Sequence, residues 1–319
     1  MELKKKIETF VATQEEKYGK DSLAETFGDR LSYVFKQVHE KTGRRVVVLI
    51  DEYDKPLLDV MNLDIPSPEA EGDIKTLEEY NREILKGFYS VFKLADKHLQ
   101  FVLLTGVTKF SQVSVFSGFN QPDDISMSGK YEALCGITKY ELLSVFDEPI
   151  HELAAKLRRS YEDTVELLKK KYDGYHFGDE MIDIFNPFSI LNCFNKLQLR
   201  NFWFASGTPS YLVRQLAHCN ENINELVGKY YDASQFIDYK ADVEQPLPMI
   251  YQSGYLTIKD YNERLYTYKL DFPNEEVRNG FIDAVASGYF KGSQSPTAWI
   301  IDVTTSLEKG DTSKFEKLM

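Results

Sequence analysis

The sequence contains only three cysteines, and its apolar runs are far shorter than a membrane span. Cys135, Cys193 and Cys219 are scattered without a Cys-x-x-Cys pair, which argues against a disulfide framework and against a zinc site. The longest aliphatic run is 46–50, whereas a transmembrane helix needs about 20 residues. The chain does not open with the basic and then apolar stretch of a signal peptide. These absences predict a cytoplasmic protein without a membrane partner.

Positive charge is scarce as well. The 319 residues include 38 Lys and Arg against 50 Asp and Glu, so the formal net charge is −12 at pH 7. Because phosphate groups repel such a surface, we do not expect nucleic acid to be a partner of this chain alone, although a local basic patch is compatible with the total. The apolar fraction of 43% is ordinary for a globular protein, and the length suits two or three domains.

The most informative segment is an apolar run that ends in acidic residues. Residues 46–50 are all aliphatic, and Asp51 and Glu52 follow directly. Such a run predicts a strand buried on both faces, and open α/β sheets bind ligands beyond the carboxyl ends of their strands. In a nucleoside triphosphatase, Asp51 would hold Mg²⁺ through water, and Glu52 would orient or deprotonate the water that attacks the γ-phosphate. The alternative is a core strand whose solvent-facing end happens to be acidic.

A second apolar run, at 100–105, follows an amphipathic helix at 77–92. The order of helix, strand, helix and strand predicts a parallel α/β sheet. If the two strands are neighbours, Thr105 or Lys109 lies within reach of the acidic residues that end the first strand. Either side chain would then occupy the position of a residue that senses the γ-phosphate.

A simpler interpretation of this second strand end remains open. Gly106 would give the backbone the freedom to turn from the strand into a helix. Thr108 or Ser111 would then cap that helix, as Thr and Ser commonly do.

The sequence pattern changes after about residue 136. Thr138 and Glu141 have the spacing of a capping box, and helical periodicity continues beyond them. Two alternating segments, 255–258 and 265–270, flank a polar turn and predict a hairpin that resembles the wing of a winged-helix domain. The turn carries a single arginine, Arg264, which argues against DNA contact at this wing.

One expected motif is missing from the whole sequence. A Mg²⁺-binding strand of this type works beside a phosphate-cradling loop of the pattern G-x-x-x-x-G-K-[ST], whose backbone amides, Lys and Ser/Thr hold the phosphates and the metal. No segment of the 319 residues has this pattern. Two adjacent carboxylates can still attract a divalent cation weakly, but they cannot hold a nucleoside triphosphate in line for attack.

Seven blocks, in order along nearly the whole chain, nevertheless resemble one family. They are Val47–Leu57 (VVLIDEYDKPL), Leu104–Ser111 (LTGVTKFS), Gly174–Phe177 (GYHF), Asn186–Ser189 (NPFS), Trp203–Pro209 (WFASGTP), Gln252–Leu256 (QSGYL) and Phe272–Val277 (FPNEEV). Together they are far more specific than an apolar run followed by Asp-Glu.

On these blocks the chain resembles the AAA-ATPase-like family of bacterial proteins, whose members usually join a P-loop module to a C-terminal nuclease-like domain of the PD-(D/E)XK type. The resemblance implies an α/β fold in which a partial P-loop parallel sheet is followed by a helical lid and a winged-helix-like region. The expected divisions are a core at 1–135, a lid at 136–235, the winged-helix-like region at 236–290 and a truncated linker at 291–319. ATP and Mg²⁺ would be the ligands of the complete family member.

The sequence departs from the family at both ends, because it contains neither the phosphate loop nor the nuclease-like domain. We therefore expect an internal fragment, in which the remaining strands expose apolar surface and open edges unless another segment or a protein partner covers them.

The leading hypothesis is a module of a nucleotide-dependent switch or ATPase that is inactive as it stands. In it Asp51 is the metal ligand, Glu52 the catalytic base, and Thr105 or Lys109 the nucleotide sensor. The second hypothesis is a non-catalytic module that binds protein or nucleic acid.

Overall fold

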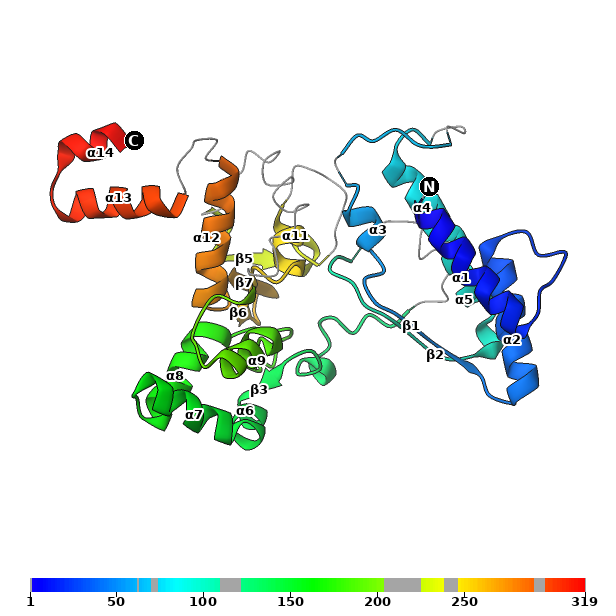
Figure 1. Cartoon of the computed structure of the whole chain (residues 1–319), viewed down its shortest axis with the longest axis horizontal. Helices are drawn as coiled ribbons and strands as arrows, with labels where there is room; N and C mark the ends of the chain where they lie inside the picture. Colours follow the sequence, from blue (N-terminus) through cyan, green and yellow to red (C-terminus); the bar gives the residue numbers. More distant parts are fainter. Residues whose placement is uncertain are drawn as a thin grey trace. The chain divides into compact units, whose positions relative to one another are not determined.

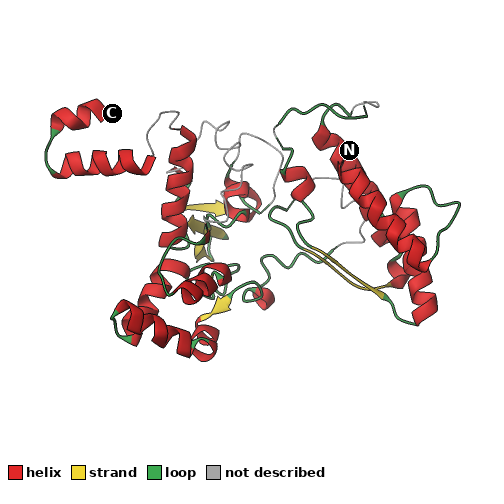
Figure 2. Cartoon of the chain, in the orientation of Figure 1, coloured by secondary structure: helices red, strands yellow, loops and turns green. Residues whose placement is uncertain are grey.

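The computed structural model describes most of the chain. The described residues are 2–61, 63–69, 74–109, 122–203, 225–237, 246–289 and 296–318. Two compact units divide the chain: Met1–Asp123 with Ile237–Asp242, and Asp124–Phe236 with Val243–Met319. Figure 1 shows the chain coloured from its N-terminus to its C-terminus, and Figure 2 shows that helices predominate over short strands. The structure is therefore mixed α/β, as expected, while the expected domain boundaries and the winged helix remain predictions.

The first unit combines helices with one parallel pair of strands. Its elements are α1 (Glu2–Tyr18), α2 (Phe27–Thr42), β1 (Val46–Ile50), α3 (Lys55–Leu58), α4 (Leu77–Tyr89), α5 (Val91–Leu94), the 3₁₀ turn η1 (Asp96–His98) and β2 (Leu99–Leu104). Helix α2 shows how locally the sequence specifies these elements. The Thr26 side chain accepts a hydrogen bond from the amide of Asp29 at its start, and Gly43 adopts φ 67° to end it.

Strands β1 and β2 are parallel neighbours, with Val48 opposite Val102 and Ile50 opposite Leu104. The predicted parallel pairing is confirmed, but the prediction that β1 is buried on both faces is wrong. Burial alternates along β1, and Val47 and Leu49 are 53% and 68% exposed. The physical reason is that successive side chains of a strand point to opposite faces, and only one face of β1 is covered by described residues.

The second unit contains a helical part. Its elements are η3 (Gly129–Tyr131), β3 (Ile137–Thr138), α6 (Lys139–Val145), α7 (Asp147–Leu157), α8 (Tyr161–Tyr172), β4 (Ile184–Phe185) and α9 (Pro187–Lys196). The capping box of Thr138 and Glu141 forms as predicted at the start of α6. These helices enclose a buried core to which Leu142, Ile150 and Tyr172 contribute.

A small antiparallel sheet and further helices complete this unit. They are β5 (Lys229–Asp232), η6 (Ala233–Gln235), α11 (Leu247–Gln252), β6 (Thr257–Asn262), β7 (Thr267–Asp271), α12 (Glu275–Tyr289), α13 (Pro296–Glu308) and α14 (Thr312–Leu318). Strands β6 and β7 form the predicted hairpin, and β5 adds a strand on the other side of β7 that the sequence did not indicate. A hairpin beside a third strand does not by itself make a winged helix, which remains a prediction.

Three smaller observations bear on the sequence-based expectations. None of the described helices is long and apolar enough to cross a membrane. Cys135 and Cys193 are free thiols, and Cys219 lies outside the described residues. Most of the block 203–209 and residues 110–111 also lie outside the described residues.

Helix α2 approaches α4 and α5 closely at Gly28, and this contact generates a prediction. A Cβ at Gly28 would lie 2.1 Å from the hydroxyl of Ser90 and 3.0 Å from the carbonyl oxygen of Gly87, whereas a Cβ at Gly87 itself would meet no atom within 4 Å. We expect Gly28→Ala to lower the free energy of unfolding by about 1–3 kcal/mol through overpacking. The matched control, Gly87→Ala, should be neutral or raise it by up to about 1 kcal/mol through helix propensity. Urea unfolding of both variants measures the difference, and equal effects would contradict the close packing.

Candidate functional site

The carboxyl ends of β1 and β2 bring predicted site residues together. The Thr105 hydroxyl donates a hydrogen bond of 2.5 Å to Oδ1 of Asp51, although the two residues are far apart in sequence. The backbone ladder continues past the strands, because the Thr105 amide donates to the carbonyl of Ile50 and the Tyr53 amide donates to the carbonyl of Thr105. Both side chains are exposed. The structure therefore places Thr105 beside Asp51, as expected for neighbouring strands.

Glu52 stands out by its backbone conformation. Its φ is 52°, in the left-handed region that few residues other than glycine adopt. Its amide donates to Oδ1 of Asp51 at 3.0 Å, and its own exposed carboxylate has no hydrogen bond or ion pair with a described residue. Left-handed backbone in a residue other than glycine costs roughly 1–3 kcal/mol and is concentrated at functional sites. The turn thus holds the Glu52 carboxylate free at the edge of the sheet.

Asp54 anchors this edge from below the surface. Its carboxylate is fully buried and accepts hydrogen bonds from the amide of Val107 at 3.2 Å and from the amide and hydroxyl of Thr108 at 2.6 and 2.8 Å. The Tyr53 hydroxyl donates to the Thr108 carbonyl at 2.6 Å. The turn after β1 is therefore fastened to the turn after β2 by side chains as well as by the ladder.

Gly106 allows the two turns to approach one another. A Cβ at this position would lie 2.6 Å from Oδ1 of Asp54 and 2.6 Å from the Tyr53 ring. The glycine is thus required by space, and not by a left-handed backbone. Of the two caps considered for this turn, the Thr108 hydroxyl is bonded to Asp54, and Ser111 lies outside the described residues.

Lys109, the other predicted sensor, is the last described residue of this stretch and is half-buried. No described hydrogen bond or ion pair joins it to Asp51 or Glu52. Its predicted role stays a prediction, whereas Thr105 has a defined position beside Asp51.

The sequence did not reveal the partners of Asp54. Its position directly before Lys55-Pro56 instead suggests the N-cap of a helix. In the structure its side chain makes no cap of α3 and turns to the other strand instead.

The exposed oxygen atoms at this edge fit a hard divalent cation. Asp51, Glu52 and Thr105 offer carboxylate and hydroxyl oxygens, which are ligands that Mg²⁺ prefers. Among the described residues no group of three or more His, Cys, Asp or Glu side chains could hold a metal ion alone. Mg²⁺ commonly keeps several waters and takes only one or two protein carboxylates beside substrate phosphates, so this sparse donor set is compatible with it.

The burial of Asp54 generates a stability prediction. In Asp54→Asn, an amide NH₂ would replace one acceptor oxygen and face the donors of residues 107 and 108. We expect the free energy of unfolding to fall by roughly 2–3 kcal/mol, because buried donors lose a charged acceptor. The control, Asp59→Asn, changes an exposed carboxylate of the same unit and should stay within about 0.5 kcal/mol of the wild type. Similar chemical denaturation curves for the two variants would show that the anchor is not needed.

One curated protein is similar to most of this chain. A protein of Azotobacter chroococcum mcd 1, named "Uncharacterized protein in vnfD 5'region", is 34% identical over 263 residues, which are 82% of this chain and 46% of that protein. The chain thus spans about half the length of this curated relative. No solved structure matches this chain.

A family model matches most of the sequence of the first unit. Residues 1–116, which include β1, β2 and the turns that follow them, match the model of the AAA-ATPase-like family, described as "Predicted AAA-ATPase". Over residues 1–116 the chain is therefore similar to the AAA-ATPase-like family.

Proposed function

We propose that the carboxyl edge of β1 and β2 is the metal-binding and hydrolytic half of a nucleoside-triphosphate site, within a nucleotide-dependent switch or ATPase. The observation that carries this proposal is the hydrogen bond between Thr105 and Asp51 at the ends of adjacent parallel strands. Open α/β sheets bind their ligands at this edge, and the similarity of residues 1–116 to the AAA-ATPase-like family supports nucleotide as the ligand.

Each residue has a distinct role in this proposal. Asp51 holds Mg²⁺, directly or through water, and the Thr105 hydroxyl fixes the orientation of the Asp51 carboxylate and senses the γ-phosphate. Glu52, whose carboxylate is free, accepts the proton of the attacking water. Lys109 is the second candidate sensor. When bound, Mg²⁺ would neutralise charge on the phosphate oxygens.

The proposed site is a half-site. The sequence contains no G-x-x-x-x-G-K-[ST] loop, so the described edge offers acids and a hydroxyl but no cradle of amides for the phosphates. We infer that another segment or a protein partner supplies the phosphate-binding side, and that this chain alone does not turn over ATP.

Divalent-cation binding tests the half-site. Mn²⁺, which substitutes for Mg²⁺ and is visible by electron paramagnetic resonance, should bind the wild-type chain more than it binds Asp51→Asn. Asp96→Asn is the matched control, since it also removes one exposed carboxylate but lies before β2, at the opposite end of the strands. We expect Asp51→Asn to lose about one weakly held ion per chain that Asp96→Asn retains. Equal Mn²⁺ binding by the two variants would refute the site.

Turnover tests the second part of the proposal. The wild-type chain with Mg²⁺ and ATP should release phosphate no faster than Glu52→Gln. A rate that Glu52→Gln abolishes would show that the chain already contains a complete catalytic site, and the inferred need for a separate phosphate cradle would be wrong.

A second candidate function is contact with another protein. Val47, Leu49 and Phe101 are each more than half exposed on the strands of the first unit, and at the β6–β7 turn Leu265 and Tyr266 are 62% and 73% exposed. Exposed apolar side chains of this kind favour protein contact over nucleic acid. Binding of protein by the sheet is compatible with the half-site, because a partner that completes the nucleotide site would also cover the sheet.

A further inference from the structure

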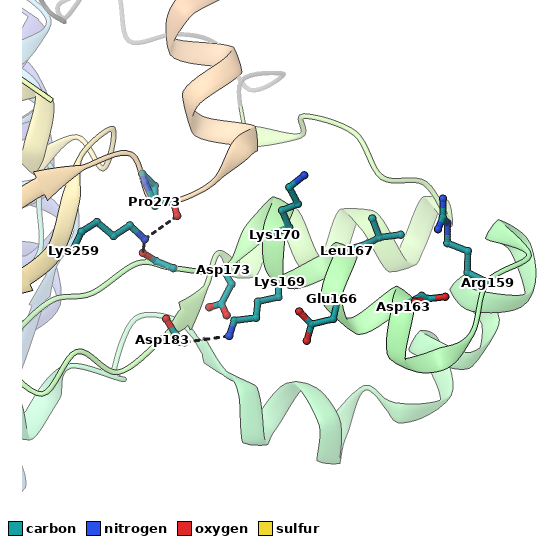
Figure 3. Close-up of a pocket in the computed structure, with 11 residues that line it drawn as sticks. Arg159, Asp163, Glu166, Leu167, Lys169, Lys170, Asp173, Asp183, Lys259 and Pro273 are labelled. Atoms are coloured by element: carbon teal, nitrogen blue, oxygen red, sulfur yellow. Dashed lines mark hydrogen bonds and ion pairs between the residues drawn. The ribbon is translucent and has the colours of Figure 1, made fainter. Parts of the chain in front are cut away.

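The second unit contains an open pocket that the nucleotide half-site does not involve. Its volume is about 620 Å³, and it extends along α8 to the segment after that helix, β6 and the start of α12 (Figure 3). The residues that line it are mostly charged: Arg159, Asp163, Glu166, Lys169, Lys170, Asp173, Asp183 and Lys259, with Leu167, Gly174 and Pro273. Asp173 and Gly174 belong to the stretch Tyr172–Phe177, part of which is one of the family-like blocks, and no role has been given to it so far.

Asp173 is the unusual member of this pocket. It is only 2% exposed, yet neither of its carboxylate oxygens has a hydrogen-bond partner among the described residues. The amide of Gly174 lies near enough to lower the pKa of this carboxyl, but it makes no hydrogen bond to either oxygen. In Figure 3 the carboxylate lies on the same side as Lys169 and Asp183, with no interaction drawn to either. A buried carboxylate without donors is costly, so its two free acceptors call for a partner.

Most of the cations in the pocket are already engaged. The Lys259 ammonium donates to the carbonyls of Gly174 and Pro273, at 2.5 and 2.9 Å. Lys170 pairs with Glu275 at 2.8 Å, and Lys169 lies 3.8 Å from Asp183.

The carboxylates, by contrast, are mostly unengaged. Besides Asp173, the side chains of Asp163 and Glu166 make no hydrogen bond or ion pair with a described residue, and they follow one another along α8 (Figure 3). Arg159 is the one lining cation without such a pair among the described residues. The pocket therefore has more free acceptors than free donors.

The helix adds to this preference. Asp173 follows the last residue of the twelve-residue α8 and its amide caps the carbonyl of Lys169. The carboxyl end of a helix carries partial negative charge and favours cations. The position of Asp173 thus combines a helix terminus with an unpaired carboxylate.

We propose that this pocket binds an organic cation rich in N–H donors, a guanidinium or primary ammonium group, with Asp173 as the buried acceptor and Glu166 and Asp163 along its path. A guanidinium can donate two parallel hydrogen bonds to one carboxylate, which matches the two free oxygens of Asp173. The described acidic residues do not converge as metal ligands, which favours an organic cation. The cation is either a free small molecule or a basic side chain of a polypeptide.

The proposed contact has a defined pH dependence. The pKa of Asp173 is raised to about 6, mainly by burial and also by the neighbouring Asp183 carboxylate, while the Gly174 amide, Lys169 and His176 oppose the shift. Lys259, from β6, also faces this carboxylate. A cation binds the ionised form, so its affinity should be highest above pH 7 and should fall as the pH drops through 6.

Calorimetric titration of the full chain at pH 7.5 tests the proposal. The small-molecule probe is N-acetyl-arginine amide, and the polypeptide probe is a hexapeptide with a central arginine. We expect saturable binding of at least one probe, weakened at least about tenfold in Asp173→Asn, because a charge-assisted pair is lost. Glu162→Gln is the control, since Glu162 is an exposed acid of α8 that does not line the pocket, and this variant should bind the probes as the wild type does.

The outcomes separate the sources of the cation. Tighter binding of the amide indicates a small molecule, and tighter binding of the hexapeptide indicates a basic segment of a protein. Failure of both probes to bind, or equal binding by Asp173→Asn and the wild type, would overturn the proposal. The test is independent of the nucleotide half-site, because no residue is shared.

A stability measurement keeps the binding result interpretable. The pKa of Asp173 is raised in the folded state, so the folded protein loses stability as the pH rises from about 4 to 6 and the carboxyl ionises. Asp173→Asn removes that charge and should raise Tm at pH 7.5, with the gain vanishing near pH 4. Loss of binding in a variant with a raised Tm cannot be due to unfolding, and an unchanged Tm at pH 7.5 would contradict the unpaired buried charge.

Discussion

The hydrogen bonds from residues 107 and 108 to the buried Asp54 carboxylate are the interaction on which the first unit depends. Two parallel strands share a ladder only as far as their ends, and beyond them the chain can diverge. Asp54 prevents this divergence by accepting from the Val107 and Thr108 amides and the Thr108 hydroxyl. The exposed pair of Asp51 and Thr105 lies at the ends of the same two strands. A buried acid that cannot touch a ligand thus determines where the exposed acids stand.

Buried carboxylates have a similar structural role in the second unit. Glu276 accepts from the Ser189 hydroxyl at 2.6 Å and from the amides of Phe202 and Trp203. Glu132 accepts from the amides of Glu180 and Ile182, at 3.1 and 3.4 Å. Both fasten segments that are distant in sequence. Asp173 differs from them, because it is equally buried but has no donor. The contrast is what distinguishes a structural acid from a candidate binding group.

The sequence predicted what local chemistry determines. The capping box of Thr138 and the parallel pair of strands both follow from short patterns and are observed. It did not predict β5, since Lys-Tyr-Tyr-Asp lacks an apolar alternation and pairs only because β7 offers an edge. Nor could it show that β1 is exposed on one face, because burial depends on which elements cover a strand.

The candidate site likewise has features that the sequence predicts and features that it does not. Asp51, Glu52 and Thr105 were identifiable because acids and hydroxyls at strand ends are a recognisable pattern. The left-handed backbone of Glu52, the long-range partners of Asp54 and the unpaired burial of the Asp173 carboxylate were not, since they depend on how distant segments pack together.

The location of a bound Mn²⁺ ion tests the central claim most directly. Two-dimensional NMR of the isotopically labelled chain would be recorded while substoichiometric Mn²⁺ broadens the amides close to it. The account predicts that the amides of Glu52, Thr105 and Gly106 broaden first. Broadening at other acidic surfaces while these three signals stay sharp would contradict it.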